Sequence, residues 1–123
     1  MKLHQTTTQD HFVISKLASD FVIINQQKHF KSCIVSATEI IANIPINSIE
    51  QLTEKHIAQL LTLNPEIIIL GSGAKHKFPD VHLLNEIAIK NIGLEVMNNQ
   101  SAARTYNVLL AEERKVVCLL LFA

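Results

Sequence analysis

The sequence contains no tryptophan, only three glycines and three prolines, and no excess of charge of either sign in 123 residues. The scarcity of glycine and proline excludes collagen-like and low-complexity disordered proteins. A formal net charge of zero removes the broad positive field with which most nucleic-acid-binding proteins hold phosphates. What remains, with 48% hydrophobic residues, is a globular chain long enough to bury a core without disulfides or a metal ion.

Long hydrophobic runs are also missing. The longest uninterrupted apolar run, Val116 to Ala123, has eight residues, whereas a membrane-spanning helix needs about 20. The polar first residues lack the apolar stretch of a secretory signal, and no arginine precedes Arg104, which argues against an arginine-rich transit peptide. We therefore predict no transmembrane segment and a cytoplasmic location.

Cysteine is scarce, and the histidines are scattered. Cys33 and Cys118 stand among apolar residues, which favours buried reduced thiols over a disulfide. The six histidines form neither H-x-H nor H-E-x-x-H, and neither cysteine lies near another metal ligand in the sequence. We predict no metal ion, no cofactor and no conventional catalytic residues.

Hydrophobic patterning predicts strands early in the chain and alternating helices and strands later. β-Branched and aromatic runs at 21–24 and 30–37, separated by the polar segment 25–29, predict an antiparallel hairpin. A helix is predicted at 53–61. Continuous apolar runs and helical spacing then predict strand, helix, strand, helix and strand at 66–70, 80–92, 94–97, 98–110 and 115–122.

These elements define an α/β fold class. Parallel pairing of the strands at 66–70 and 94–97 requires a right-handed crossover through the helix between them. We predict one domain with a mixed central sheet, helices packed on it and an antiparallel N-terminal hairpin. The domain is expected to span 13–123, after a partly loose N-terminal segment at 1–12.

Gly71, Ser72 and Gly73 directly follow the predicted strand at 66–70, at the edge where open α/β sheets usually bind ligands. Glycines let backbone N–H groups approach an anion, and Lys75 would add positive charge beside them. The complete dinucleotide and phosphate-loop fingerprints are missing. A tight strand-to-loop turn therefore stays open as the structural alternative.

Asn98, Arg104 and Asn107 form a second polar cluster, where the next predicted strand runs into a helix. The planar guanidinium of Arg104 could clamp a carboxylate or phosphate near the glycine loop. In the structural alternative, Arg104 pairs with a nearby glutamate, while Tyr106 and Asn107 tie the helix to the sheet.

Ordered blocks of the sequence resemble one family. They are Pro65 to Gly73, Ile92 to Met97, Ala102 to Leu109 and Glu112 to Val116. The strand-Gly-x-Gly and Arg-Thr-Tyr-Asn blocks together resemble the Mth-type domain family. These small α/β proteins, long of unknown function, include a mitochondrial assembly factor for respiratory complex I and an adipogenesis-associated protein. The resemblance implies the same mixed-sheet fold and a role in assembling other proteins.

The chain departs from the family pattern in three places. The family usually has threonine where Ser72 stands, Asp-Thr where Asn98-Asn99 stand, and glycine where Glu113 stands. Ser72 keeps the hydroxyl, but Asn98 removes a carboxylate. No acid-base or metal role of the family's aspartate therefore carries over to this chain.

We interpret the chain as a non-enzymatic cytosolic interaction or assembly protein, with assembly of respiratory complex I as the role that the resemblance suggests. The high apolar content of a small chain predicts self-association or protein partners, and no nucleic-acid partner is expected. The alternative hypothesis is a protein, or an enzyme, that binds a small anionic ligand with Gly71, Ser72, Gly73, Lys75, Asn98, Arg104 and Asn107.

Overall fold

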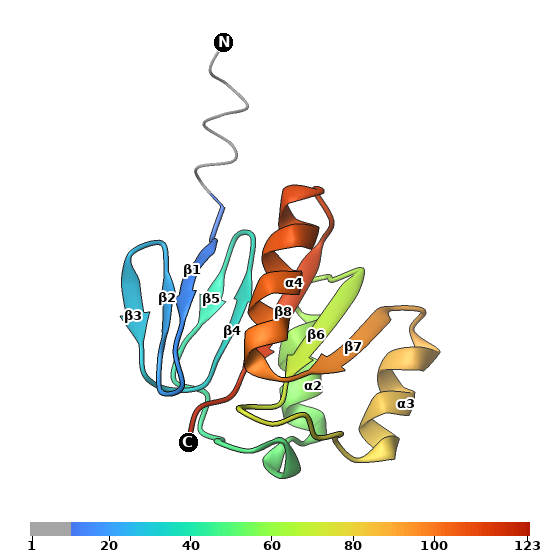
Figure 1. Ribbon diagram of the computed structural model, residues 1–123. Coiled ribbons are helices and arrows are strands. Elements are labelled where there is room, and N and C mark those ends of the chain that lie inside the picture. The colour runs from blue at the N-terminus through green and yellow to red at the C-terminus, as the bar shows by residue number, and fades with distance from the viewer. Residues whose placement is uncertain (1–10) are drawn as a thin grey trace.

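A five-stranded mixed sheet forms the centre of the fold (Figure 1). The structure is a computed structural model that describes residues 11–123. In the spatial order of the sheet, the strands are β5 (Ile40–Ile41), β4 (Cys33–Ser36), β8 (Val116–Leu120), β6 (Ile67–Gly71) and β7 (Gly93–Met97). β6 runs parallel to both β7 and β8, whereas β4 is antiparallel to β8 and β5. The predicted α/β fold class is confirmed.

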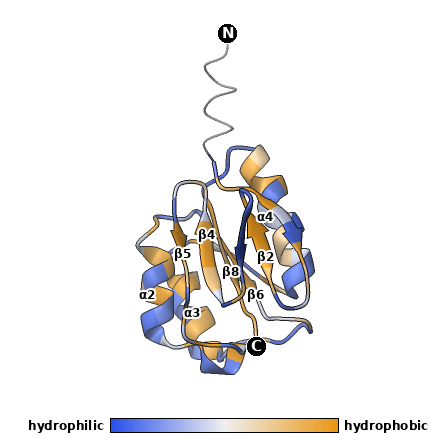
Figure 2. Ribbon diagram, turned by 90° about the vertical axis from the view of Figure 1, so that its left-hand side faces the viewer, coloured by the Kyte–Doolittle hydropathy of each residue, from blue (hydrophilic) through white to orange (hydrophobic). Residues whose placement is uncertain are grey.

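Helices cover both faces of this sheet. On one face lie α2 (Glu54–Leu61) and α3 (Val81–Ile89), after a short 3-10 helix, η1 (Ile49–Gln51). On the other face lies α4 (Asn99–Ala111), beside a second, smaller sheet (Figure 2). Because both faces are covered, the central strands are almost entirely apolar, and β8 is buried along its whole length.

The second sheet contains the N-terminal hairpin, β1 (Ile14–Leu17), β2 (Val22–Ile24) and β3 (Gln27–His29). The antiparallel hairpin is present, but its turn is shorter than predicted. Asn25 and Gln26 have positive φ angles of 45° and 76°, which suit a two-residue turn that matches strand twist. The polar segment that follows therefore pairs with β2, and the apolar run predicted to be its partner forms β4 of the central sheet.

The first residues of the chain bear on the predicted domain limits. Residues 1–10 of the expected loose segment, 1–12, lie outside the described residues. Phe12 is held on both sides, because its N–H donates to the Ala37 carbonyl (3.0 Å) and its carbonyl accepts from the Tyr106 hydroxyl (2.7 Å). The division into 1–12 and 13–123 stays a prediction.

Cys33 and Cys118 are buried free thiols in the same core cluster, as the sequence predicted. Burial raises the pKa of the Cys33 thiol to about 12 and raises the pKa of Cys118 well above its ordinary value. Because the thiolate is the reactive form, we expect neither thiol to react with Ellman's reagent in the native protein and both to react in urea. Rapid labelling of a natively folded sample would contradict this burial.

The end of α4 explains why the family usually has glycine at position 113. The Arg114 N–H donates to the Leu109 carbonyl (3.0 Å) and the Glu113 N–H to the Leu110 carbonyl (2.9 Å). This pattern requires a left-handed residue just past the helix, and Glu113 has a φ of 63°. For a residue other than glycine, this left-handed backbone conformation costs about 1–2 kcal/mol relative to the right-handed one.

We therefore expect Glu113→Gly to raise the free energy of unfolding by about 0.5–1 kcal/mol. This is the strain relieved in the folded chain less the conformational entropy that glycine adds to the unfolded chain. Urea denaturation measures the change. Glu112→Gly is the matched control, because Glu112 has an ordinary φ of −85° and glycine should destabilise the chain there. Equal effects of the two substitutions would argue against a strained Glu113.

Candidate functional site

The parallel strands β6 and β7 end side by side, as the sequence predicted. In their register, Gly71 lies opposite Met97. The Ser72 N–H donates to the Met97 carbonyl (2.9 Å), and the Asn99 N–H donates to the Gly73 carbonyl (2.7 Å). The loop after β6 and the start of α4 are therefore one hydrogen-bonded unit.

The two glycines of this loop meet different demands. A Cβ atom at Gly71 would lie 2.7 Å from Asn99 Oδ1 and 2.7 Å from the Leu119 carbonyl oxygen, which is too close for any side chain. Gly73 has a φ of 100°, in the region that favours glycine. Packing thus requires the first glycine, and backbone conformation requires the second.

The Ser72 hydroxyl organises the loop. It is buried, lies 2.7 Å from the Lys75 carbonyl and 3.3 Å from the Met97 carbonyl, and accepts a hydrogen bond from the Lys77 N–H (3.1 Å). The one hydroxyl proton is donated to these carbonyls, and an oxygen lone pair is used by the amide. The Ser72 hydroxyl is thus already hydrogen-bonded, as donor and as acceptor, to backbone groups of the same chain.

Asn99 is the residue of this edge that sequence reasoning missed. Its Oδ1 accepts from the N–H groups of Gly73 (3.0 Å) and Leu121 (3.4 Å), and its Nδ2 donates to the Leu121 carbonyl (2.7 Å). The side chain is buried. The signal in the sequence was the pair of asparagines after an apolar strand: Asn98 serves as the helix N-cap, and the second carboxamide is left to join the segments after β6 and β8.

The other predicted residues of this edge have different surroundings. Asn98 caps α4, because its Oδ1 accepts from the Ser101 N–H (2.9 Å). Lys75 is exposed on the loop. Arg104 is also exposed, and its guanidinium donates to the Ser101 hydroxyl at 3.4 Å.

Asn107 lies away from the glycine loop, on the side of α4 that faces β1. Its Oδ1 accepts from the Ile14 N–H (3.0 Å), and its Nδ2 donates to the Ile14 carbonyl (2.7 Å). The carboxamide therefore pairs with β1 as a neighbouring strand would. Together with the bond from the Tyr106 hydroxyl to Phe12, it joins the small sheet to α4.

The structure thus brings together part of the predicted set. Gly71, Ser72, Gly73 and Asn98 meet at the end of β6 and β7, where Asn99 connects them. Asn107 belongs to a separate contact with β1. Binding of an anionic ligand by these residues stays a prediction.

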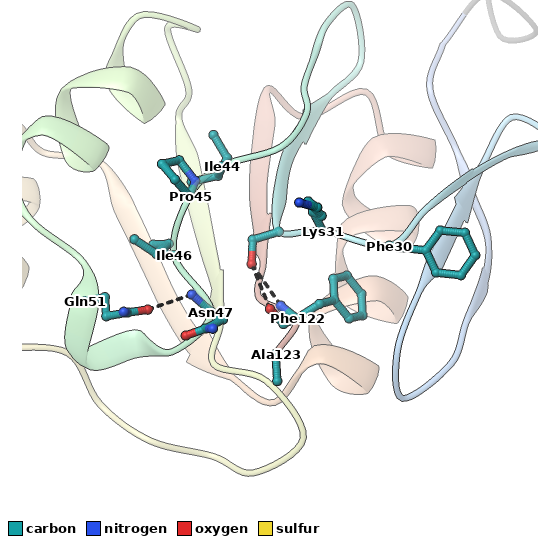
Figure 3. A pocket seen from close by; sticks show the side chains of 10 residues that line it. Phe30, Lys31, Ile44, Pro45, Ile46, Asn47, Gln51, Phe122 and Ala123 are labelled. Atoms are coloured by element: carbon teal, nitrogen blue, oxygen red, sulfur yellow. Dashed lines mark hydrogen bonds between the residues drawn. The ribbon is translucent and has the colours of Figure 1, made fainter.

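A cavity of about 280 Å³ lies elsewhere, at the start of β4 (Figure 3). The Ser32 hydroxyl accepts from the Phe122 N–H (2.9 Å), and Gln51 Oε1 accepts from the Asn47 N–H (2.7 Å), so these groups hold the walls of the cavity. None of the predicted site residues lines it. Its lining consists of Phe30, Lys31, Ser32, Ile44, Pro45, Ile46, Asn47, Gln51, Phe122 and Ala123.

Perturbed ionisable groups outside this edge have local structural causes. A hydrogen bond from the Arg114 guanidinium lowers the pKa of Glu66, and burial lowers the pKa of His56. Among residues 11–123, no three histidine, cysteine or acidic side chains gather in a way that would hold a metal ion. None of the helices in that part of the chain has the length and apolar character that crossing a bilayer requires.

The mixed sheet, the N-terminal hairpin and the strand edge built on the glycine loop give this chain the fold of a Mth938-like domain. The solution structure of a Bordetella pertussis protein described as a Mth938-like domain superimposes with a TM-score of 0.79, at 22% identity, over 93% of this chain and 87% of that one. The chain belongs to the family described as protein of unknown function (DUF498/DUF598), whose model matches residues 14–121. The resemblance to the Mth-type family is confirmed at this level.

Two further proteins are similar over nearly their whole length. The 13 kDa major membrane protein of Francisella tularensis subsp. holarctica (strain LVS) is 29% identical over 122 residues, which cover 98% of this chain and 99% of that one. The crystal structure of an outer membrane protein from Bartonella henselae has a TM-score of 0.80 at 24% identity and covers 94% of this chain and 98% of that one.

The predicted cytoplasmic location is wrong. The Francisella and Bartonella proteins carry names that place them in membranes, and this points away from a plainly cytoplasmic protein. The prediction rested on the lack of a long apolar run. That criterion detects spanning helices, whereas proteins also associate with membranes through surface side chains or lipid anchors.

Proposed function

We propose that the protein is a non-enzymatic interaction protein that binds other polypeptide chains at a membrane. The observation that supports the proposal is an exposed apolar surface on α3 and the loop before it. Phe78 is 66% exposed, Val81 60% and Ile89 82%; we call these three side chains the α3 patch. Several exposed large apolar side chains on one helix and the loop before it are typical of a surface that a partner covers.

The hydrogen bonds of the glycine loop support a structural rather than a catalytic role for it. A serine nucleophile needs a base within hydrogen-bond reach. The Ser72 hydroxyl instead contacts backbone groups, and the Nε2 atom of His76 lies 3.0 Å from the Val96 carbonyl. The loop and Asn98 thus act as the frame that joins the sheet to α4.

The membrane part of the proposal is supported by the relative that is named a membrane protein. The narrower role, help with the assembly of respiratory complex I, comes from the family resemblance alone. Co-purification of the protein with assembly intermediates of that complex tests this role. Their absence from the purified material would exclude it.

Light scattering after size exclusion, over a range of protein concentrations, tests binding through the α3 patch. We expect the wild-type chain either to associate with itself, seen as a molar mass above that of the monomer, or to form a larger complex when a native membrane extract is added. The variant Val81→Ser/Ile89→Ser should be monomeric and capture no partner. Val108→Ser is the control, because Val108 is also exposed, at 56%, but lies on α4.

Wild-type protein that stays monomeric and captures nothing would contradict the proposal. Equal loss of association in the α4 control would also contradict it, because the effect would then not belong to the α3 patch. Circular dichroism of each variant shows that the compared chains are folded.

A second candidate function is binding of a small anionic ligand at the glycine loop. Arg104 favours it, because this guanidinium is exposed and its side-chain hydrogen bond within residues 11–123 goes to the Ser101 hydroxyl. A thermal-shift panel of inorganic phosphate, nucleotides and organic acids tests it. A ligand at about 100 times its Kd stabilises a protein by about 2.7 kcal/mol, and Arg104→Ala should abolish that shift. No shift across the panel would contradict ligand binding.

A further inference from the structure

Four side chains form a continuous basic and aromatic cluster on the small sheet. Lys28 Nζ lies 4.5 Å from the ring centroid of Phe21 and 5.8 Å from that of Phe30. Lys16 Nζ lies 6.0 Å from the Phe21 ring, and the two rings meet edge to face at 5.8 Å. We call Lys16, Phe21, Lys28 and Phe30 the lysine–phenylalanine cluster.

Strand register extends this cluster across the outward face of the small sheet. Ile23 of β2 lies between Lys16 of β1 and Lys28 of β3 in the pairing. Its neighbours Val22 and Ile24 are buried in the core, so Ile23 points to the opposite face, because side chains alternate along a strand. Figure 2 shows that β2 is hydrophobic. The outward face therefore has an apolar centre flanked by ammonium groups.

Positive charge is concentrated in this part of a neutral chain. Between residues 14 and 31 there are three lysines, Lys16, Lys28 and Lys31, and one carboxylate, Asp20, whereas the whole chain has no net charge. Lys31 is exposed and lies at the cavity beside Phe30. Residues 14–31 therefore carry a net charge of +2, which the rest of the chain balances.

Phe30 is the feature of this face that the fold does not explain. The residue is 58% exposed, although burying its ring in the core would stabilise the fold. Aromatic rings and long lysine side chains together are typical of the boundary between lipid headgroups and acyl chains, where the ring sits in the interface and the ammonium groups reach phosphates.

We infer that the outward face of the β1–β3 sheet docks on the surface of an anionic phospholipid bilayer. Lys16, Lys28 and Lys31 contact lipid phosphates, while Phe30 and Ile23 enter the headgroup region. Nucleic acid fits less well, because a chain of zero net charge has little long-range attraction for a polyanion and the apolar centre of the face would stay in water. This inference rests on the proposed membrane location but not on the α3 patch, so lipid docking and protein binding can fail separately.

Co-sedimentation of the full chain with vesicles tests the inference. We expect binding to phosphatidylcholine vesicles that contain phosphatidylglycerol, little binding to phosphatidylcholine alone, and release by salt. Each lysine near an anionic surface contributes about fivefold in partitioning, so Lys16→Gln/Lys28→Gln should weaken binding about 25-fold. The matched control, Lys55→Gln/Lys90→Gln, changes the net charge equally, on α2 and just after α3, and should leave binding within about twofold.

Phe30→Ser is a second variant that keeps every lysine. It should weaken binding by about fivefold through the loss of apolar insertion and leave the salt dependence in place. The inference is overturned by failure of the wild type to bind anionic vesicles, by equal losses in the two double lysine variants, or by binding of duplex DNA through the same lysines without vesicle binding. Melting curves of all variants confirm that the compared chains are folded.

Discussion

Replacing Asn99 with alanine is expected to lower the free energy of unfolding by about 3–4 kcal/mol, the largest loss from any single polar side chain of the strand edge. The substitution removes the acceptor of the Gly73 and Leu121 N–H groups and the donor to the Leu121 carbonyl. Each buried polar group left without a partner costs about 1–3 kcal/mol. Urea denaturation followed by circular dichroism measures the loss.

Asn85→Ala is the control for this change. Asn85 is exposed on α3, so its removal should alter stability by less than about 0.5 kcal/mol. A loss below about 1 kcal/mol for Asn99→Ala would mean that water replaces the carboxamide, and that the edge is more open than the burial of Asn99 indicates.

Gly71→Ala is expected to destabilise the fold by about 3 kcal/mol, because one methyl group would overpack a site closed by backbone. The new Cβ would meet the Leu119 carbonyl oxygen and Asn99 Oδ1, both at 2.7 Å. The Leu119 oxygen is part of a central strand and cannot rotate away as a flexible side chain does. The shift in urea midpoint at unchanged slope measures the effect.

Gly93 provides the matched comparison. It starts the neighbouring strand β7, and a Cβ there would meet the Ile67 side chain at 3.4 Å and the Glu66 carbonyl at 3.5 Å, which are ordinary contacts. Gly93→Ala should therefore change stability by less than about 1 kcal/mol, in either direction. Similar losses at both glycines would show that strand flexibility, and not close packing, sets the requirement at Gly71.

Much of the central fold could be predicted from the sequence, because the spacing of apolar residues there agrees with the side chains that the structure buries. The continuous apolar run at 66–70 is a strand covered on both faces, and the glycines after it mark its end. A helix between two neighbouring strands lets the chain return and pair in parallel, and β6 and β7 are parallel in the structure. The helix ended earlier than the predicted 92, because Asn91 adopts a left-handed φ of 60° that no periodicity reveals.

The small sheet and the polar contacts could not be predicted in the same way. Gln27 and Lys28 have no apolar alternation, so β3 forms because of the turn at Asn25 and Gln26 and not because of its own pattern. The sequence placed Asn98 and Asn107 in one polar cluster because they are neighbours in the chain. A helix turns side chains around its axis, and Asn107 therefore faces β1 while Asn98 caps the start of α4.

The contact of β1 with Asn107 joins residues 93 positions apart, and this separation has a consequence during synthesis. The hairpin can close as soon as it leaves the ribosome, but α4, which packs against it, is translated only after β4 to β7. Contacts between such distant residues also slow folding. Until α4 has been made, the inner side chains Ile14, Val22 and Ile24 of the hairpin, which are buried in the folded chain, face water. An incomplete chain therefore exposes an apolar surface that favours aggregation.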